Sequence, residues 1–140
     1  MKTFAPRLLL LSALLFLVAG CVSNAKLGGL SVKIIEAKAL SDGRTELTLE
    51  YYNDNLLPVG ISTSQHTLTL DGRKQDRISI KEPVGLPRLA TGRQTTTVSL
   101  TPAPVAGTTL SYRLESALSI DAGDQELRSN TQSSGTVEVK

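Results

Sequence analysis

Polar and apolar residues alternate with a period of two along much of the chain from residue 30 onward. In residues 44–52 the alternation is uninterrupted, with Thr45, Leu47 and Leu49 on the same side of the extended chain. This pattern is typical of an antiparallel strand that buries one face. Similar segments predict further strands at residues 30–39, 61–70, 78–80, 96–100, 109–120, 125–131 and 134–140. No segment has the period of an amphipathic helix.

Turn residues separate these segments. Ser41-Asp42-Gly43 predicts a turn, and Asp71-Gly72 predicts a tight β-hairpin. Two prolines and two glycines lie within residues 81–93, which we therefore expect to lack regular structure. A change of phase at Ile34-Ile35 indicates a β-bulge or a strand buried on both faces. Seven or eight short strands separated by such turns predict an all-β antiparallel sandwich.

The first 20 residues have a different character. Two basic residues precede an apolar run at residues 8–18, which is too short to span a bilayer but suits a secretory signal. The run ends in Leu17-Val18-Ala19-Gly20-Cys21, which resembles the lipobox of bacterial lipoproteins. The resemblance implies that a signal peptidase recognises Leu17, Val18, Ala19 and Gly20 and removes residues 1–20. Cys21 would then carry a diacylglycerol. An ordinary secretory signal with an incidental cysteine is the alternative.

A lipidated Cys21 would decide where the protein resides. Two or three acyl chains hold a protein stably on a membrane without spanning it. Residues 21–29 would form a lipidated end and a short tether, and residues 22–29 reach at most about 27 Å. The folded domain, residues 30–140, would therefore lie near its membrane. Val22 in place of an aspartate favours the outer membrane of the cell envelope, facing the periplasm.

The single cysteine argues against a disulfide, and the charge balance argues against a nucleic-acid partner. Cys21 is the only cysteine, so lipidation leaves no disulfide and the core alone must stabilise the domain. The chain has 15 Lys+Arg and 13 Asp+Glu; without Lys2 and Arg7 each sign numbers 13, and the charges are interspersed. Nucleic-acid binding requires a basic patch, so we expect no nucleic-acid partner. The expected partners are the membrane, through the lipid, and an unidentified envelope protein.

Residues 53–61, Asn-Asp-Asn-Leu-Leu-Pro-Val-Gly-Ile, resemble a signature segment of the late embryogenesis abundant type 2 (WHy domain) family. Further similarity lies at Leu68–Gly72, Ala90–Gly92, Val98–Leu100, Tyr112–Glu115, Leu118–Asp121 and Gly135–Val139. The resemblance implies an immunoglobulin- or fibronectin III-like sandwich of about seven strands, an association with water stress, and no catalytic residues. Asn53, Asn55 and Pro58 would form a structural corner between two strands, where Asp54 replaces the family's usual proline.

The groups that could support chemistry form no recognisable active site. His66 is the only histidine, and it lies in phase with Leu68 and Leu70. We therefore expect a structural histidine at a sandwich edge, since a catalytic base needs a nucleophile or an orienting carboxylate and a zinc site needs three or four ligands. Asp121 and Asp124 form the best acidic cluster, but aspartates also favour turns through bonds to their own backbone.

We consequently predict no catalytic residue, no metal and no cofactor other than the covalent lipid on Cys21. Tyr51 and Tyr52 adjoin the Asn-rich segment and could bind a partner or a sugar. Adjacent strand residues point to opposite faces, so we expect Tyr51 in the core and Tyr52 on the surface.

Three functions remain open. The favoured one is a non-enzymatic, membrane-anchored envelope lipoprotein whose domain protects other components under water stress or desiccation. The alternative is an accessory lipoprotein that docks a partner in a secretion, transport or envelope-assembly complex, for example by strand addition. An enzyme, the third, would have to work without any of the usual residue constellations.

Overall fold

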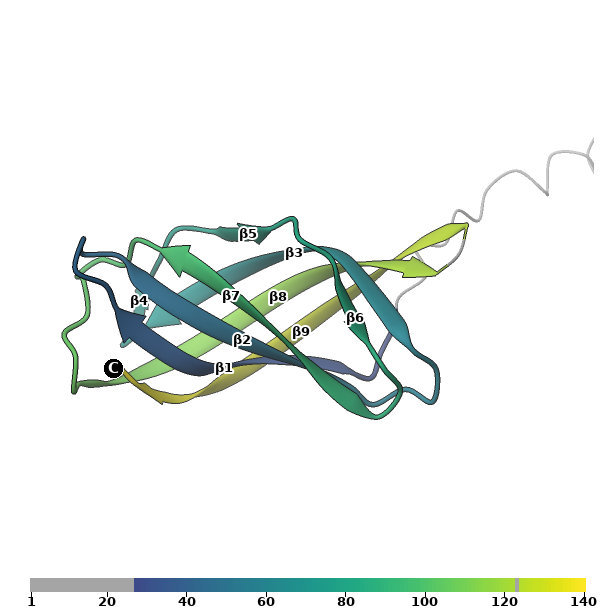
Figure 1. The fold of residues 1–140 in the computed structure, drawn as a ribbon, viewed down its shortest axis with the longest axis horizontal. Helices are drawn as coiled ribbons and strands as arrows, with labels where there is room; N and C mark the ends of the chain where they lie inside the picture. Colours follow the sequence, from purple (N-terminus) through teal and green to yellow (C-terminus); the bar gives the residue numbers. More distant parts are fainter. Residues whose placement is uncertain (1–26, 123) are drawn as a thin grey trace, which may run out of the picture.

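The computed structural model describes residues 27–122 and 124–140, which form nine β-strands in two packed sheets (Figure 1). The strands are β1 (Leu30–Ala39), β2 (Thr45–Asn53), β3 (Val59–Leu70), β4 (Arg73–Lys74), β5 (Ile78–Ile80), β6 (Val84–Leu86), β7 (Ala90–Val98), β8 (Thr109–Ala122) and β9 (Gln125–Glu138). The pairing within both sheets is antiparallel, which confirms the predicted all-β sandwich. These residues include no helix long and apolar enough to cross a membrane.

The two sheets differ in size. The smaller has the order β1-β2-β7, and the larger has the order β4-β3-β8-β9. β4, β5 and β6 pair with successive parts of one side of β3, while β8 pairs with its other side. β3 is therefore an interior strand of the larger sheet. The sheets also meet where β1 approaches the chain end after β9, through the parallel bridge Ala37–Val139.

The alternation in the sequence places one face of each long strand in the core between the sheets. In β2, Thr45, Leu47, Leu49 and Tyr51 are buried, and the residues between them are more exposed. Tyr51 has no exposed surface and Tyr52 is 38% exposed, as predicted. Each fully buried Leu or Ile side chain contributes roughly 1.5–3 kcal/mol relative to exposure.

Two local predictions are confirmed. The register of β1 on β2 shifts between Ile34 and Glu36, so the change of phase marks a β-bulge. Asp71 and Gly72 have φ angles of 46° and 79° and join β3 to β4, with Leu70 opposite Arg73. Positive φ at both central residues characterises the two-residue hairpin turn that Asp-Gly favours.

The prediction that residues 81–93 lack regular structure is wrong. They contain β6 and the beginning of β7. Pro83 and Pro87 flank β6 without entering it, so its residues remain able to pair with β3. Proline has no backbone N–H to donate, but this is tolerated here because both prolines lie just outside a short edge strand.

The division of residues 125–140 into two strands is also wrong. β9 is continuous, and its pairing with β8 runs from Gln125 opposite Ala122 to Glu138 opposite Thr109. The polar–apolar alternation of β9 is weak because several of its inward-facing positions hold small polar residues, among them Ser129. With β4 and β6 added, the described chain has nine strands rather than about seven.

Candidate functional site

The segment that connects β2 to β3 carries the chain from the smaller sheet to the larger one. Asn53 ends β2 and is completely buried, whereas Leu56, Leu57 and Pro58 are exposed. Val59 then begins β3 and is buried again. Pro58 thus precedes the first residue of a strand, a position where the missing N–H removes no sheet hydrogen bond.

The buried carboxamide of Asn53 organises this corner. Its Nδ2 lies 2.9 Å from the carbonyl oxygen of Leu57, 3.3 Å from that of Leu86 and 3.1 Å from that of Pro87. Its Oδ1 accepts from the backbone N–H and the side-chain Nδ2 of Asn55, both at 3.0 Å. One side chain therefore joins the β2–β3 connection to the β6–β7 connection, and a buried polar group without these bonds would be costly.

Asn55 extends the network to the N-terminal segment. Its Nδ2 also donates to the carbonyl oxygen of Gly28, at 3.0 Å. The backbone N–H of Asp54 donates to the carbonyl oxygen of Gly29 at 2.7 Å, and that of Leu89 donates to the carbonyl oxygen of Asn55 at 3.3 Å. The corner consequently holds three connections together: the segment before β1, the β2–β3 turn and the β6–β7 turn. Asp54 contributes its backbone here, while the residue itself is exposed.

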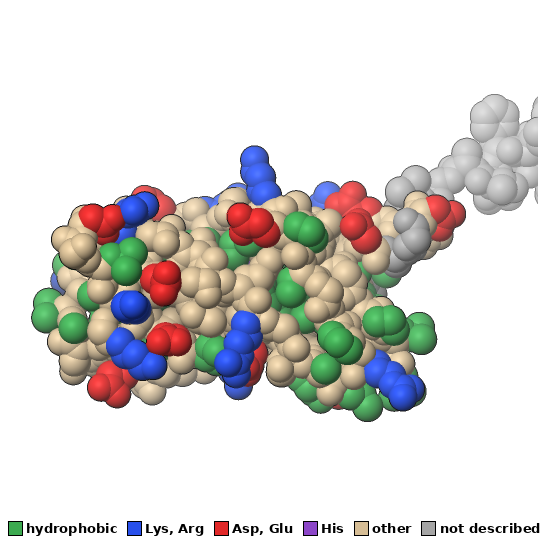
Figure 2. All heavy atoms as spheres, viewed as in Figure 1, with side chains coloured by type: hydrophobic (Ala, Val, Ile, Leu, Met, Phe, Trp, Pro, Cys, Tyr) green, Lys and Arg blue, Asp and Glu red, His purple; other side chains and the backbone are tan. Residues whose placement is uncertain are grey.

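Three leucines project from this corner, and together they form what we call the apolar tip: Leu56, Leu57 and Leu89. Their exposed fractions are 75%, 74% and 52%. Figure 2 shows hydrophobic side chains gathered at the lower right end of the molecule, where Figure 1 places the β2–β3 and β6–β7 connections. Sequence reasoning missed this feature, because Leu56 and Leu57 read as apolar positions of a structural segment and Leu89 stood in a segment expected to be irregular.

His66 lies at the centre of a second polar network, inside the sandwich. Its Nδ1 is 2.7 Å from Ser116 Oγ, and its Nε2 is 2.9 Å from Ser64 Oγ and 3.3 Å from the Tyr51 hydroxyl. The Tyr51 hydroxyl is also 3.2 Å from Ser64 Oγ. Because Tyr51 belongs to β2 and the other residues belong to β3 and β8, the network links the two sheets.

The surroundings of His66 favour a neutral, inaccessible imidazole. The residue has no exposed surface, and burial lowers its pKa from 6.5 to about 4. None of its hydrogen-bond partners is a carboxylate, so the imidazolium that a general base must form has no counter-charge. The expected position at a sandwich edge is wrong, because β3 pairs with strands on both of its sides.

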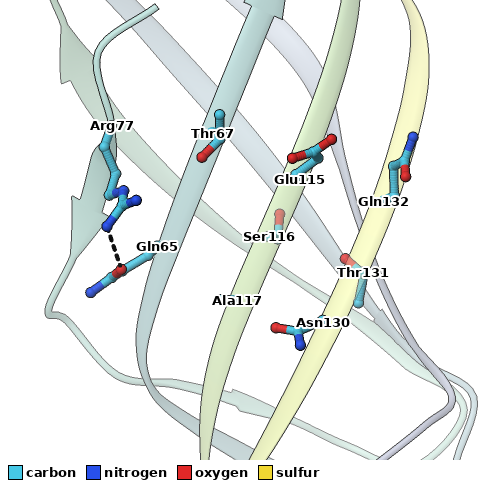
Figure 3. A pocket seen from close by; sticks show the side chains of 9 residues that line it. All are labelled: Gln65, Thr67, Arg77, Glu115, Ser116, Ala117, Asn130, Thr131 and Gln132. Atoms are coloured by element: carbon cyan, nitrogen blue, oxygen red, sulfur yellow. Dashed lines mark hydrogen bonds between the residues drawn. The ribbon is translucent and has the colours of Figure 1, made fainter.

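A groove of about 470 Å³ lies across β3, β8 and β9 on the larger sheet (Figure 3). Polar side chains line it, including Thr67, Glu115 and Asn130. Arg77 Nη1 lies 3.5 Å from Gln65 Oε1 at one side. Ser116 contributes to the floor, but its hydroxyl is bonded to His66. The groove offers hydrogen-bonding groups without an activated nucleophile.

The remaining predicted residues divide into two groups. Leu17, Val18, Ala19, Gly20 and Cys21 lie outside the described residues, as does most of the tether. The turn aspartates are described, and among residues 27–122 and 124–140 no three His, Cys, Asp or Glu side chains are grouped as a metal site requires.

Comparisons with known proteins find similarity in the fold but not in the sequence. No family model and no curated protein sequence matches the chain. A protein from Archaeoglobus fulgidus has a TM-score of 0.49 and 16% identity, with 79% of this chain and 96% of that chain covered. A candidate late embryogenesis abundant protein has a TM-score of 0.48 and 16% identity, with 94% and 86% covered. The sporulation control protein Spo0M from Bacillus subtilis has a TM-score of 0.45 and 11% identity, with 80% and 50% covered.

Similarity at this level gives no information about activity, ligand or partner. The structure itself defines the class as an antiparallel β-sandwich domain, with a corner held by the hydrogen bonds of Asn53 and an exposed apolar tip.

Proposed function

We propose that the protein is a non-enzymatic lipoprotein of the bacterial cell envelope, anchored through lipid on Cys21 and carrying a late embryogenesis abundant type 2-like domain. The observation that carries the proposal is the sequence Leu17-Val18-Ala19-Gly20-Cys21 after a basic start and an apolar run. Its order and length are those of a secretory signal, and its only cysteine stands where a lipobox requires it. Val22, where an aspartate would favour retention in the inner membrane, supports an anchor in the outer membrane with the domain facing the periplasm.

Two features of the domain support a role without catalysis. The sole histidine is buried in a neutral network between the sheets, where a substrate has no access. The asparagines of the family-like segment are engaged with backbone carbonyls and with each other. The resemblance of residues 53–61 to the late embryogenesis abundant type 2 segment then favours protection of envelope components under water stress.

The anchor is tested by replacing Cys21 with Ser in the bacterium that expresses the protein. We expect the unchanged chain to incorporate labelled palmitate, lose residues 1–20 and float with membranes. Cys21→Ser should abolish palmitate incorporation and processing, whereas Ser23→Ala, a change two residues away, should retain both. A Cys21→Ser protein that is still cut and acylated would refute the lipobox assignment.

The protective role is tested on the anchored protein in cells and on the purified domain. We expect the domain to preserve the activity of a dried test enzyme better than an unrelated β-sandwich of equal mass. In-cell crosslinking with mass spectrometry should return many neighbours at low yield. A single stoichiometric partner, with no protection of the dried enzyme, would replace this role with that of an accessory subunit of an envelope complex.

A further inference from the structure

We propose that the apolar tip, Leu56, Leu57 and Leu89, inserts into the interfacial region of the membrane that carries the lipid anchor. The tip would then be a second membrane contact that sets the orientation of the sandwich. This inference rests on the proposed anchorage at Cys21. The occupant of the tip is a lipid surface, and the proposal follows from three features of the described chain.

The first feature is the exposure of the leucines on a fixed backbone. Leu56 and Leu57 are about three-quarters exposed, although the Leu57 carbonyl accepts from Asn53 Nδ2 and the residue before Leu56, Asn55, is bonded to Asn53 Oδ1. Leu89 comes from a different connection, and its N–H is tied to the Asn55 carbonyl. The three side chains therefore project together from a rigid support. Clustered exposed leucines at the end of a domain indicate a surface that is covered in function.

The second feature is the backbone of Leu89. Its φ is 52°, in the left-handed region that a bulky side chain rarely adopts. Glycine or asparagine would relieve this strain, and a polar residue would better suit a side chain that is half exposed. The leucine is thus unfavourable both for the local backbone and for solvation. Its presence is explained if the side chain has a nonpolar surface to contact.

The third feature is the place where the tether leaves the domain. Asn55, which adjoins Leu56, donates its side-chain N–H to the carbonyl oxygen of Gly28. Gly28 is the seventh residue after Cys21, so the acylated cysteine lies at most about 24 Å along an extended chain from the base of the tip. The membrane that holds the acyl chains is consequently the surface that the tip can reach.

The charges around the tip indicate an apolar contact rather than an electrostatic one. Arg88 and Asp54 are both exposed beside the leucines and balance each other. The β8–β9 hairpin, which meets the N-terminal segment where Leu27 N–H donates to the Arg128 carbonyl, carries three exposed acidic residues and one exposed basic residue: Asp121, Asp124, Glu126 and Arg128. Anionic lipid would not attract such an end. Insertion should therefore occur in a membrane without net charge.

The test uses the acylated protein purified from membranes and reconstituted into vesicles of phosphatidylethanolamine and brominated phosphatidylcholine. Lipidation blocks Cys21, so a bimane fluorophore attached to Leu57→Cys reports on the tip alone. Val105→Cys is the matched control, because Val105 is 67% exposed in the connection before β8, beyond the other end of β3. β3 has 12 residues and spans about 36 Å. Equal thermal unfolding of the two labelled proteins confirms that both are folded.

We expect the brominated lipid to quench the fluorophore at position 57 and to leave position 105 unquenched. An acylated protein that stays with the vesicles but shows no quenching at position 57 would overturn the tip contact and leave the anchor intact. Equal quenching at both positions would overturn the orientation and hence the proposal. A protein that is not acylated and does not remain with the vesicles would remove the anchor, and the tip proposal with it.

A second variant separates membrane contact from folding. Leu89→Gly removes one leucine of the tip and relieves the positive-φ strain, so the domain should be at least as stable as the unchanged protein. Quenching of the fluorophore at position 57 should nevertheless decrease in this variant. Unchanged quenching would exclude Leu89 from the contact and overturn the three-leucine assignment. Crosslinking of the tip to a protein in cells, without quenching in vesicles, would assign the tip to a protein partner instead.

Discussion

Acidification from pH 7.5 to pH 5 should destabilise the folded domain through one residue, His66. The unfolded chain takes up a proton on this imidazole below a pKa near 6.5, whereas burial lowers the pKa in the folded state to about 4. Between these values the unfolded state binds more protons, so stability falls as the pH falls. The loss begins near pH 6.5 and is complete near pH 4.

The magnitude follows from the difference between the two pKa values. At pH 5 the solution is 1.5 pH units below the unfolded pKa and still above the folded one. At about 1.36 kcal/mol per unit, the free energy of unfolding should decrease by about 2 kcal/mol relative to pH 7.5. His66 is the only histidine in the chain, so no second imidazole contributes. Hydrogen bonds from Lys140, Arg44 and Lys33 lower the pKa values of the Glu36, Asp42 and Glu50 carboxylates from 4.5, 3.8 and 4.5, so the stability that these pairs contribute is lost on stronger acidification.

The assay is urea unfolding of residues 22–140, followed by far-ultraviolet circular dichroism at both pH values. His66→Gln is the control: it loses part of the network with Ser64, Ser116 and Tyr51 and should be less stable at pH 7.5, but it should lose little further stability by pH 5. Equal stability of the unchanged domain at both pH values would refute the reasoning. An equal loss in the variant would do the same. Proton NMR of the single imidazole provides an independent reading of its pKa.

Two further predictions concern the corner and the core. Asn53→Ala should lower the free energy of unfolding by about 1–3 kcal/mol, because three backbone carbonyls lose a buried donor. Asn53→Asp should lower it further, because a carboxylate cannot donate to these carbonyls. Equal stability of the asparagine and aspartate proteins in urea unfolding would contradict this prediction. Gly92→Ala should cost about 1–3 kcal/mol, because the added Cβ would lie 2.6 Å from Leu86 Cδ2. Gly85→Ala is its control, with no heavy atom within 4 Å of the added Cβ, and similar urea midpoints for the two alanine variants would argue against a close approach at Gly92.

Much of the fold could be predicted from local patterns. The period of two identified the long strands, and the phase change at Ile34-Ile35 located the bulge. Asp71-Gly72 located a hairpin because the backbone of that turn requires positive φ at both residues. These features depend on neighbours in sequence, so the sequence alone contains the information. The sequence is likewise the sole source for the lipobox, which lies outside the described residues.

The partners of each strand depend on distant residues. β9 is one strand because β8 supplies a partner along its whole length, although the small polar residues of β9 make its own pattern weak. The three residues of β6, which lie between Pro83 and Pro87, form a strand because the side of β3 at Val59–Ile61 is available to pair with them. The position of His66 follows the same reasoning: its phase predicted burial, but the short strands beside β3 turned an expected edge into an interior position.

The extended strands, several of their turns and the candidate anchor can all be read from neighbouring residues, because backbone preference and the polarity of neighbouring residues are local properties. That Leu56, Leu57 and Leu89 share one exposed surface beside the N-terminal segment depends on contacts between residues far apart in the sequence. In the sequence, Leu56 and Leu57 stand in the expected corner between two strands, and Leu89 stands 32 residues further on in a segment expected to be irregular. They lie at one end of the sandwich because hydrogen bonds of Asn53 and Asn55 join the β2–β3 connection, which carries Leu56 and Leu57, to the β6–β7 connection, which carries Leu89.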